Sequence, residues 1–207
     1  MPSERKRPWY LVLALLCALA LGMVGACNGW AAWTLYREPV DATIAGQGIS
    51  DPADRAALVA RVEAYVHTLD EAKPRGWPVA VASVLLGTAI VVLAMRTLGG
   101  SSGARAALVQ IVVAQAGLNA ASYWLLRDVM DAETRWREAS QVAELHEKMP
   151  DRAHADEALP MLTRMARARN PIGLVLGTIG SVFVVVALTR RRARDFFDPG
   201  AAAVEER

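Results

Sequence analysis

The sequence has few of the residues that carry enzyme chemistry, and it holds them in no known arrangement. Its 207 residues include two cysteines and three histidines. It contains no nucleophile motif, Walker loop, dinucleotide fingerprint or haem-attachment pair. The histidines and carboxylates match no known metal-ligand spacing. We therefore expect no enzymatic activity, no cofactor and no bound metal.

Both cysteines, Cys17 and Cys27, lie in one apolar stretch near the N-terminus. On a helix they would be ~15 Å apart along the axis, well beyond the ~7 Å limit for a disulfide. No other cysteine is present, so an internal disulfide is excluded and packing must hold the chain together.

Charged residues make up 21% of the chain, yet four long stretches contain none. A soluble helical protein would scatter charges along the exposed face of each helix. As a helix the first stretch would reach ~42 Å, enough to cross a hydrocarbon core of ~30 Å. We therefore predict an all-α polytopic membrane protein with the lipid bilayer as its solvent. Its four transmembrane helices are expected at about residues 9–36, 77–96, 105–127 and 171–189.

The charges outside these stretches are distributed unequally between the two sides of the membrane. Segments on the N-terminal side carry 10 Lys+Arg against 5 acidic residues, whereas the other side carries 13 against 16. Short basic segments favour the cytoplasmic side, which places both termini in the cytoplasm. Because membrane orientation accounts for the basic clusters, we expect no binding of nucleic acid. Frequent Ala, Arg and Val suggest a GC-rich bacterium, so we expect the inner membrane.

A second interpretation of the first stretch stays open, because Val24 to Cys27 resembles a lipoprotein cleavage site. Against processing there, the apolar character continues to Tyr36, and the apolar region exceeds the 7 to 15 residues of a typical secretion signal. Retention of the first span is favoured.

The segment between the first two spans predicts an external helix over about residues 52–72. Asp51 can cap it, and Pro74 is expected to end it. Within this helix four apolar side chains fall on one stripe at spacings of 4, 3 and 4 residues. We call Leu58, Val62, Tyr65 and Leu69 the apolar stripe.

The second half of the chain predicts a similar arrangement. The third span is expected to continue outward to about residue 149, followed by a loop at 150–155 and an external helix at about 157–169. Residues 99–103 predict a flexible cytoplasmic linker. The tail at 195–207 lacks periodicity and is expected to be disordered.

The two halves also share spacings that predict a tandem duplication of a unit made of a span, an external helical segment and a return span. The repeats would comprise residues 1–98 and 104–194 and have the same orientation. An Asn and a Trp five residues later recur at an offset of 91 residues, and an Arg follows shortly after each pair. These residues are Asn28, Trp33 and Arg37, matched by Asn119, Trp124 and Arg127.

Polar and small residues within the spans are the candidate sites. Amides in hydrocarbon need hydrogen-bond partners, so we expect interhelical contacts, with a polar conduit or ligand site as the alternative. Small residues four apart allow close helix packing. The candidate polar contacts are Asn28, Gln115, Asn119 and Ser122. The candidate packing residues are Gly22, Gly173, Gly177 and Ser181.

These features favour a non-enzymatic interaction or assembly subunit that presents a periplasmic helical bundle. Its partners would be another membrane or periplasmic protein, or further copies of this chain. Two alternatives remain: a ligand-sensing protein that signals through a partner, and a small channel or transporter component.

The charge map generates a direct topological prediction. In a variant without Cys17 and Cys27, a cysteine at Ser140 will react with an impermeant thiol reagent added to spheroplasts, and one at Ser101 will not. The reverse labelling pattern would invert the topology.

Overall fold

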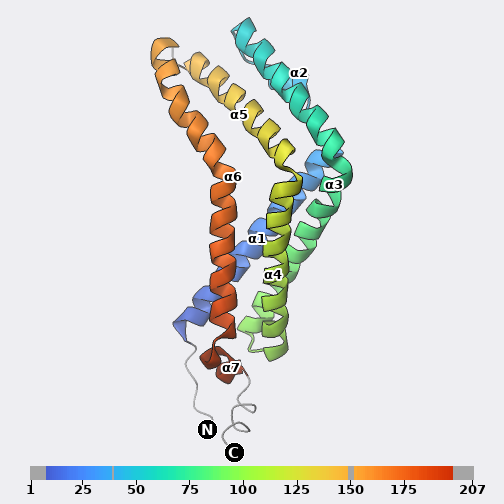
Figure 1. Cartoon of the computed structure of the whole chain (residues 1–207), viewed down its shortest axis with the longest axis vertical. Coiled ribbons are helices and arrows are strands. Elements are labelled where there is room, and N and C mark those ends of the chain that lie inside the picture. Colours follow the sequence, from blue (N-terminus) through green and yellow to red (C-terminus); the bar gives the residue numbers. More distant parts are fainter. Residues whose placement is uncertain (1–7, 39, 149–151, 198–207) are drawn as a thin grey trace, which may run out of the picture. The chain divides into compact units, whose positions relative to one another are not determined.

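The computed structural model describes residues 8–38, 40–148 and 152–197, and these form helices with no strand (Figure 1). The prediction of an all-α chain is therefore confirmed. Four of the helices are long and apolar enough to cross a membrane. The helices are α1 Trp9–Arg37, α2 Ala42–Ala45, α3 Pro52–Leu98, α4 Ser102–Leu125, α5 Arg127–Lys148, α6 Arg152–Thr189 and α7 Arg191–Phe197.

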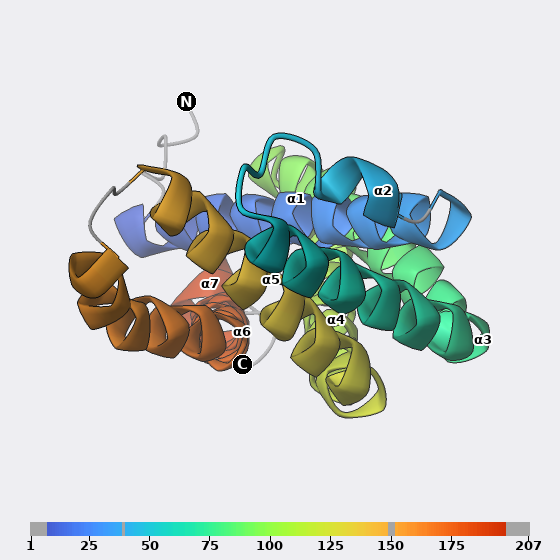
Figure 2. The same ribbon diagram turned by 90° about the horizontal axis from the view of Figure 1, so that it is seen from above.

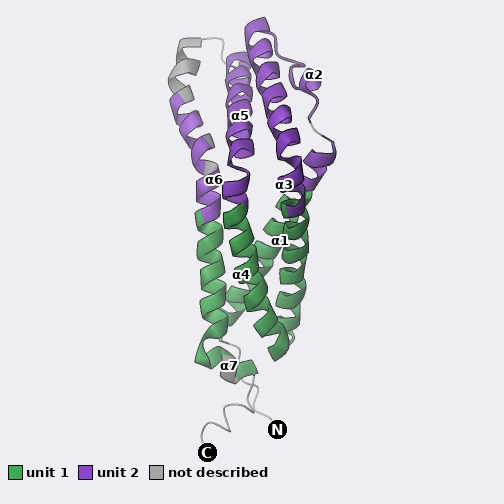
Figure 3. Cartoon of the chain, turned by 45° about the vertical axis from the view of Figure 1, so that its right-hand side comes forward, with its two compact units in different colours: residues 1–31, 79–121, 175–207 green, residues 32–78, 122–174 purple. Residues whose placement is uncertain are grey.

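The chain divides into two compact units, coloured separately in Figure 3. Unit 1 contains residues 1–31, 79–121 and 175–207, and unit 2 contains residues 32–78 and 122–174. Four long helices, α1, α3, α4 and α6, contribute residues to both units.

Unit 1 has a narrow core and a large apolar surface. At most 28% of the most apolar window of each spanning helix is buried. Leu16 is 54% exposed and Leu85 is 65% exposed. A water-soluble protein rarely exposes apolar surface on this scale, whereas hydrocarbon solvates it. The core comprises Leu11, Leu15, Ala18, Ile90, Ala94, Leu108, Val112, Val184, Leu188, Ala193 and Phe197.

Within unit 1, α1 and α3 approach each other closely enough for their backbones to touch. A Cβ atom added at Gly22 would lie 2.8 Å from the carbonyl oxygen of Gly87. One added at Gly87 would lie 2.5 Å from the backbone nitrogen of Ala26. Ala18 and Ala14, one and two turns before Gly22, are fully buried. Only small residues allow this separation between helix axes.

The turn between α3 and α4 is tighter than the flexible linker predicted for residues 99–103. Gly100 has a φ of +93°, which favours glycine, and its N–H donates to the carbonyl of Thr97 at 2.9 Å. Ser101 donates to the carbonyl of Arg96 at 3.4 Å, and α4 begins at the next residue. A glycine C-cap therefore closes α3 and leaves only three residues between the helices.

The prediction of a disordered tail from residue 195 is wrong for residues 195–197, which belong to α7. Ala193 is fully buried and Phe197 is 9% exposed in the core of unit 1. The guanidinium of Arg105 lies 5.9 Å from the centre of the Phe197 ring. Seven residues are too few to reveal a helical period, and tertiary contact stabilises the helix. Residues 198–207 lie outside the described part of the chain.

In unit 2, the N-terminal half of α3 runs beside α5 (Figure 2). The four residues of the apolar stripe are 1% to 4% exposed. The ring centroids of Tyr65 and Trp136 are 6.0 Å apart. At the start of α3, Asp51 accepts a hydrogen bond from the N–H of Ala53 at 2.8 Å, so the predicted cap is present. Tyr65 of the stripe thus has an apolar partner in α5.

Pro74 does not end the helix, because α3 continues through Pro74 and Pro78 to Leu98. The prediction of separate helices at 52–72 and 77–96 is therefore wrong. The two prolines lack N–H donors for the carbonyls of Asp70 and Pro74, which lie one turn apart on the same face. This costs about 3 kcal/mol per proline. Two effects offset this cost. The apolar stripe before the prolines is buried, and the apolar half after them must be helical because its backbone groups find no other hydrogen-bond partners in hydrocarbon.

The second half of the chain shows two further differences from the prediction. Leu126 forms a turn between α4 and α5, although the N–H of Met130 still donates to its carbonyl at 3.0 Å. The helix expected at 157–169 begins earlier, at Arg152, and continues through Pro160 and Pro171 to Thr189. The predicted loop at 150–155 is therefore wrong from residue 152 onward. Residues 149–151 lie outside the described part of the chain.

The contact between α1 and α3 predicts opposite effects for two identical substitutions. Gly87→Ala should lower the free energy of unfolding by about 1 to 3 kcal/mol, because the new methyl group overlaps the backbone of α1. Gly177→Ala should be neutral or stabilise by up to about 1 kcal/mol, because nothing lies within 4 Å of that position. Thermal unfolding of the two purified variants in one detergent compares them directly. Equal effects would contradict the close packing.

Candidate functional site

The amide residues predicted on α4 are only partly turned inward. Gln115 is 4% exposed, and its Nε2 atom donates to Oδ1 of Asn119 at 3.0 Å. A Cβ atom at Gly25 would lie 3.3 Å from this same Nε2, so Gln115 packs against α1. Asn119 and Asn28 are both exposed. A contact between Asn28 and another helix therefore stays a prediction.

Gln115 is a buried polar residue of unit 1 whose side chain lacks one hydrogen-bond partner among the described residues. Its Oε1 atom is buried and accepts no hydrogen bond from the residues that the structure describes. Desolvating an amide oxygen without a donor costs about 1 to 3 kcal/mol. The other polar candidate on this helix, Ser122, is half-buried and belongs to unit 2.

The small residues predicted on α6 behave differently from Gly22. Side chains added at Gly173 or Gly177 would meet nothing within 4 Å among the described residues, so these two glycines pack against no other described helix. Ser181 is 8% exposed, and its hydroxyl donates to the carbonyl of Gly177 at 2.8 Å. The inward face of α6 carries Ser181, Val184 and Leu188 instead. Small residues four apart form a ridge on any helix, but only the fold decides whether that ridge faces another helix.

Two cavities in unit 2, both lined by α5 and α6, were not predicted from the sequence. The smaller has a volume of about 200 Å³ and the larger about 440 Å³. Thr134 and Asn170 line both cavities. The smaller is also lined by Glu133, Trp136, Arg137, Ser140 and Gln141. The larger is also lined by Tyr123, Arg127, Met130, Asp131, Arg135, Glu138, Arg167 and Pro171.

The larger cavity has more basic than acidic side chains. Arg167 donates through Nε to Oε1 of Glu138 at 2.9 Å, and this hydrogen bond and charge raise the pKa of the Arg167 guanidinium. Arg127 and Arg135 are exposed and form no ion pair with the described residues. Among the described residues, no carboxylate occupies the donors of either cation, so both can bind another group.

In the smaller cavity the cation already has partners. The Arg137 guanidinium lies 5.5 Å from the centre of the Trp136 ring, and its Nε donates to Glu133 at 2.8 Å. The unsatisfied group here is the indole Nε1 of Trp136, which is buried without a hydrogen-bond acceptor among the described residues. This cavity offers a neutral donor rather than a free positive charge.

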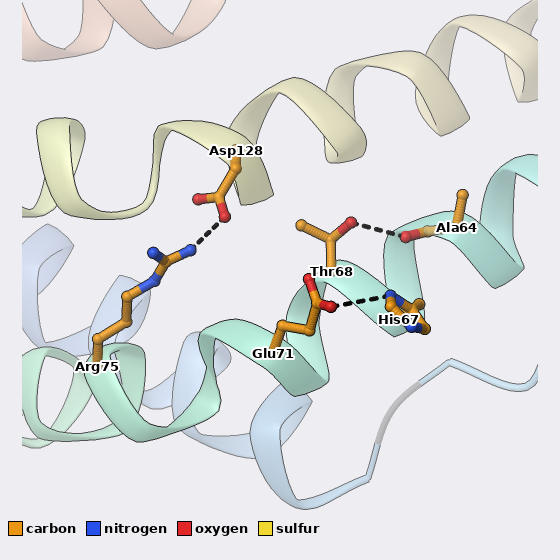
Figure 4. Close-up of polar contacts among 6 residues, drawn as sticks. All are labelled: Ala64, His67, Thr68, Glu71, Arg75 and Asp128. Atoms are coloured by element: carbon orange, nitrogen blue, oxygen red, sulfur yellow. Dashed lines mark hydrogen bonds and ion pairs between the residues drawn. The ribbon is translucent and has the colours of Figure 1, made fainter.

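Two polar contacts join α5 to α3, one near each end of α5. Near the start of α5, Asp128 pairs with Arg75 of α3, and Figure 4 shows the two side chains pointing toward each other. Near its end, Nδ1 of His146 lies 2.8 Å from Oδ2 of Asp54. These contacts align α5 with α3 and thereby position the cavity-lining face of α5.

A further contact near the end of α5 involves Glu147. Its Oε1 accepts a hydrogen bond from the N–H of Ser50 at 2.9 Å. Hydrogen bonding by Ser50 lowers the pKa of the Glu147 carboxyl. This contribution to stability is present above the carboxyl's ordinary pKa and is lost as the pH falls through the lowered value.

Comparison of the chain with protein-family models, curated proteins and solved structures finds no match. Function therefore has to be argued from the geometry. Among the described residues no group of three or more His, Cys, Asp or Glu side chains is placed to hold a metal ion. The arrangement offers an ordered helical surface, a cavity with available guanidinium groups and a buried amide.

The two ion pairs of α5 should differ in their contribution to stability. The side chains of His146 and Asp54 are 14% and 19% exposed, whereas those of Arg75 and Asp128 are 46% and 48% exposed. Asp54→Ala should lower the free energy of unfolding by about 1 to 3 kcal/mol, and Asp128→Ala by no more than about 1 kcal/mol.

The two substitutions are matched, because both remove a carboxylate from the first turn of a helix. Limited proteolysis and thermal unfolding at pH 7 measure the difference. A larger loss for Asp128→Ala would contradict the ranking by burial.

Proposed function

We propose that this chain is a non-enzymatic interaction or assembly subunit of the bacterial inner membrane. In this proposal unit 2 forms a periplasmic helical bundle that binds another membrane or periplasmic protein, or a further copy of the chain. The single observation that carries the proposal is the order of unit 2. Its helices bury a continuous apolar stripe and are joined by polar contacts near both ends of α5.

The proposed topology rests on charge. Both termini would be cytoplasmic, because the short basic segments at residues 5–7, 96–105 and 190–194 lie on one side. Of these 207 residues, only short segments would then lie on the cytoplasmic side. The larger surface would lie outside, which is why we assign the interaction to unit 2.

Retention of the first span supports the same proposal. α1 continues without a break through Val24 and Cys27, and Leu11 and Leu15 belong to the core of unit 1. Cleavage before Cys27 would remove these core residues and the Gly22 contact with α3. We therefore propose that the first span stays in the mature protein.

The tandem duplication is also part of the proposal. In each proposed repeat the return helix is long, contains two prolines and passes from a charged to an apolar segment, as α3 and α6 do. The repeats differ in their outgoing helices. α1 ends at Arg37, whereas α4 is followed directly by α5. The proposed duplication would thus have diverged most in the first external segment.

A second candidate function, ligand sensing, is favoured by the larger cavity between α5 and α6. Two guanidinium groups there have no ion-pair partner among the described residues. A transporter role has weaker support, because Gln115 is the buried amide in unit 1 and no charged side chain lies within the apolar stretches.

Co-purification tests the assembly proposal with two neighbouring residues as a matched pair. Val62 is 1% exposed in the apolar stripe, while Arg61 is exposed on the same helix. The tagged chain, purified from its own membranes in a gentle detergent, should retain a defined partner or a second copy. Val62→Asp should lose that partner, because a buried carboxylate loosens unit 2. Arg61→Asp introduces the same side chain at an exposed position, so this variant should retain the partner.

A monomeric chain without a stoichiometric partner would contradict the assembly role. Equal retention by both variants would also contradict it, since the ordered bundle would then be irrelevant to binding.

A further inference from the structure

The larger cavity lies where two helices change from polar to apolar sequence. Arg127 directly follows the uncharged stretch that ends at Leu126, and Asn170 begins the apolar segment of α6. Tyr123 and Pro171 also line the cavity. Tyr and Arg at the ends of apolar helices are typical of the head-group layer of a bilayer. The cavity is therefore lined by residues that border the hydrocarbon layer.

The charge arrangement of this cavity leaves cations available for an anion. Along α5, Arg127, Asp131 and Arg135 follow one another at intervals of four residues, so they share one face of the helix. Opposite them, Arg167 is held by Glu138. With that pair neutralised, two guanidinium groups remain against the single carboxylate of Asp131.

We propose that this cavity binds the phosphate group of an anionic head group or soluble phosphate ester, with Arg127 and Arg135 as its cationic donors. Guanidinium groups suit phosphate oxygens because they present paired N–H donors. The amide of Asn170 and the hydroxyl of Tyr123 are neutral donors in the same lining. The volume of about 440 Å³ is within the range of small-ligand sites.

The smaller cavity does not compete for this role. Its one arginine, Arg137, already pairs with Glu133 and lies over the ring of Trp136. The phosphate proposal rests on the larger cavity alone and does not depend on the assembly role of unit 2. A chain without a protein partner could still bind phosphate, and the reverse also holds.

The test uses the full-length chain in an uncharged detergent, with two probes. Phosphatidylglycerol is compared with zwitterionic phosphatidylcholine by native mass spectrometry, and glycerol 3-phosphate is titrated by calorimetry. We expect phosphatidylglycerol to bind about tenfold or more tightly than phosphatidylcholine. The double variant Arg127→Gln, Arg135→Gln should abolish this preference and the binding of glycerol 3-phosphate. Arg164→Gln on α6 is the matched control, because Arg164 is exposed and does not line the cavity.

The two sources of phosphate give different results. A preference for phosphatidylglycerol without binding of glycerol 3-phosphate identifies a lipid head group. Binding of glycerol 3-phosphate without a lipid preference identifies a soluble ester. Binding of both probes supports the shared phosphate chemistry.

A variant of opposite sign separates binding from a structural effect. Asp131→Asn removes the remaining carboxylate and should strengthen phosphate binding severalfold. The proposal is overturned if neither probe binds, if the double variant binds like the unmodified chain, if Arg164→Gln loses as much as the double variant, or if Asp131→Asn weakens binding. Circular dichroism of each variant establishes that its helices are intact.

Discussion

The contact of α1 with α3 at Gly22 and Gly87 is the interaction on which unit 1 depends. In hydrocarbon, packing two apolar helices together gains no hydrophobic free energy, because lipid chains are as apolar as leucine. Attraction must then come from close van der Waals contact, which is possible only where side chains are absent or small. Gly22, Ala18 and Ala14 provide that surface on α1, and the core residues of α4, α6 and α7 complete the cluster.

Unit 2 is held together by different forces. Its apolar stripe is nearly fully buried, and the rings of Tyr65 and Trp136 have their centroids 6.0 Å apart. The polar contacts of Asp54 with His146 and of Arg75 with Asp128 add direction rather than much energy, because exposed pairs contribute little. They fix which face of α5 meets α3, and so which residues of α5 line the cavities.

Unsatisfied polar groups distinguish the sites where this chain can still bind. Among the described residues, Gln115 has a buried oxygen without a donor, and Trp136 has a buried N–H without an acceptor. Both atoms belong to neutral groups, whereas the cationic Arg127 and Arg135 border a cavity large enough for a small anion. The combination of free charge and space is why the arginine cavity, and not the buried amide, supports a binding proposal.

Local physics made much of the architecture predictable from the sequence alone. Exclusion of charge from hydrocarbon marks the four spans, helical periodicity marks the stripe from Leu58 to Leu69, and Asp51 marks the start of α3. These signals act between neighbours in the chain, so no knowledge of the fold is needed. The uninterrupted course of α3 through Pro74 was not predictable in this way, because contacts on both sides of the proline outweigh its local cost.

The sequence by itself determined which segments are apolar and helical, and only the tertiary structure decided which face of each helix is used. Gly22 and Gly177 look alike in sequence, yet a side chain added at Gly22 would meet a neighbouring backbone, and one added at Gly177 would meet nothing within 4 Å among the described residues. The cavity likewise joins Arg127 and Arg135 with Asn170, more than thirty residues away. Such pairings depend on the rotation of whole helices about their axes, which packing against distant segments sets and local sequence does not encode.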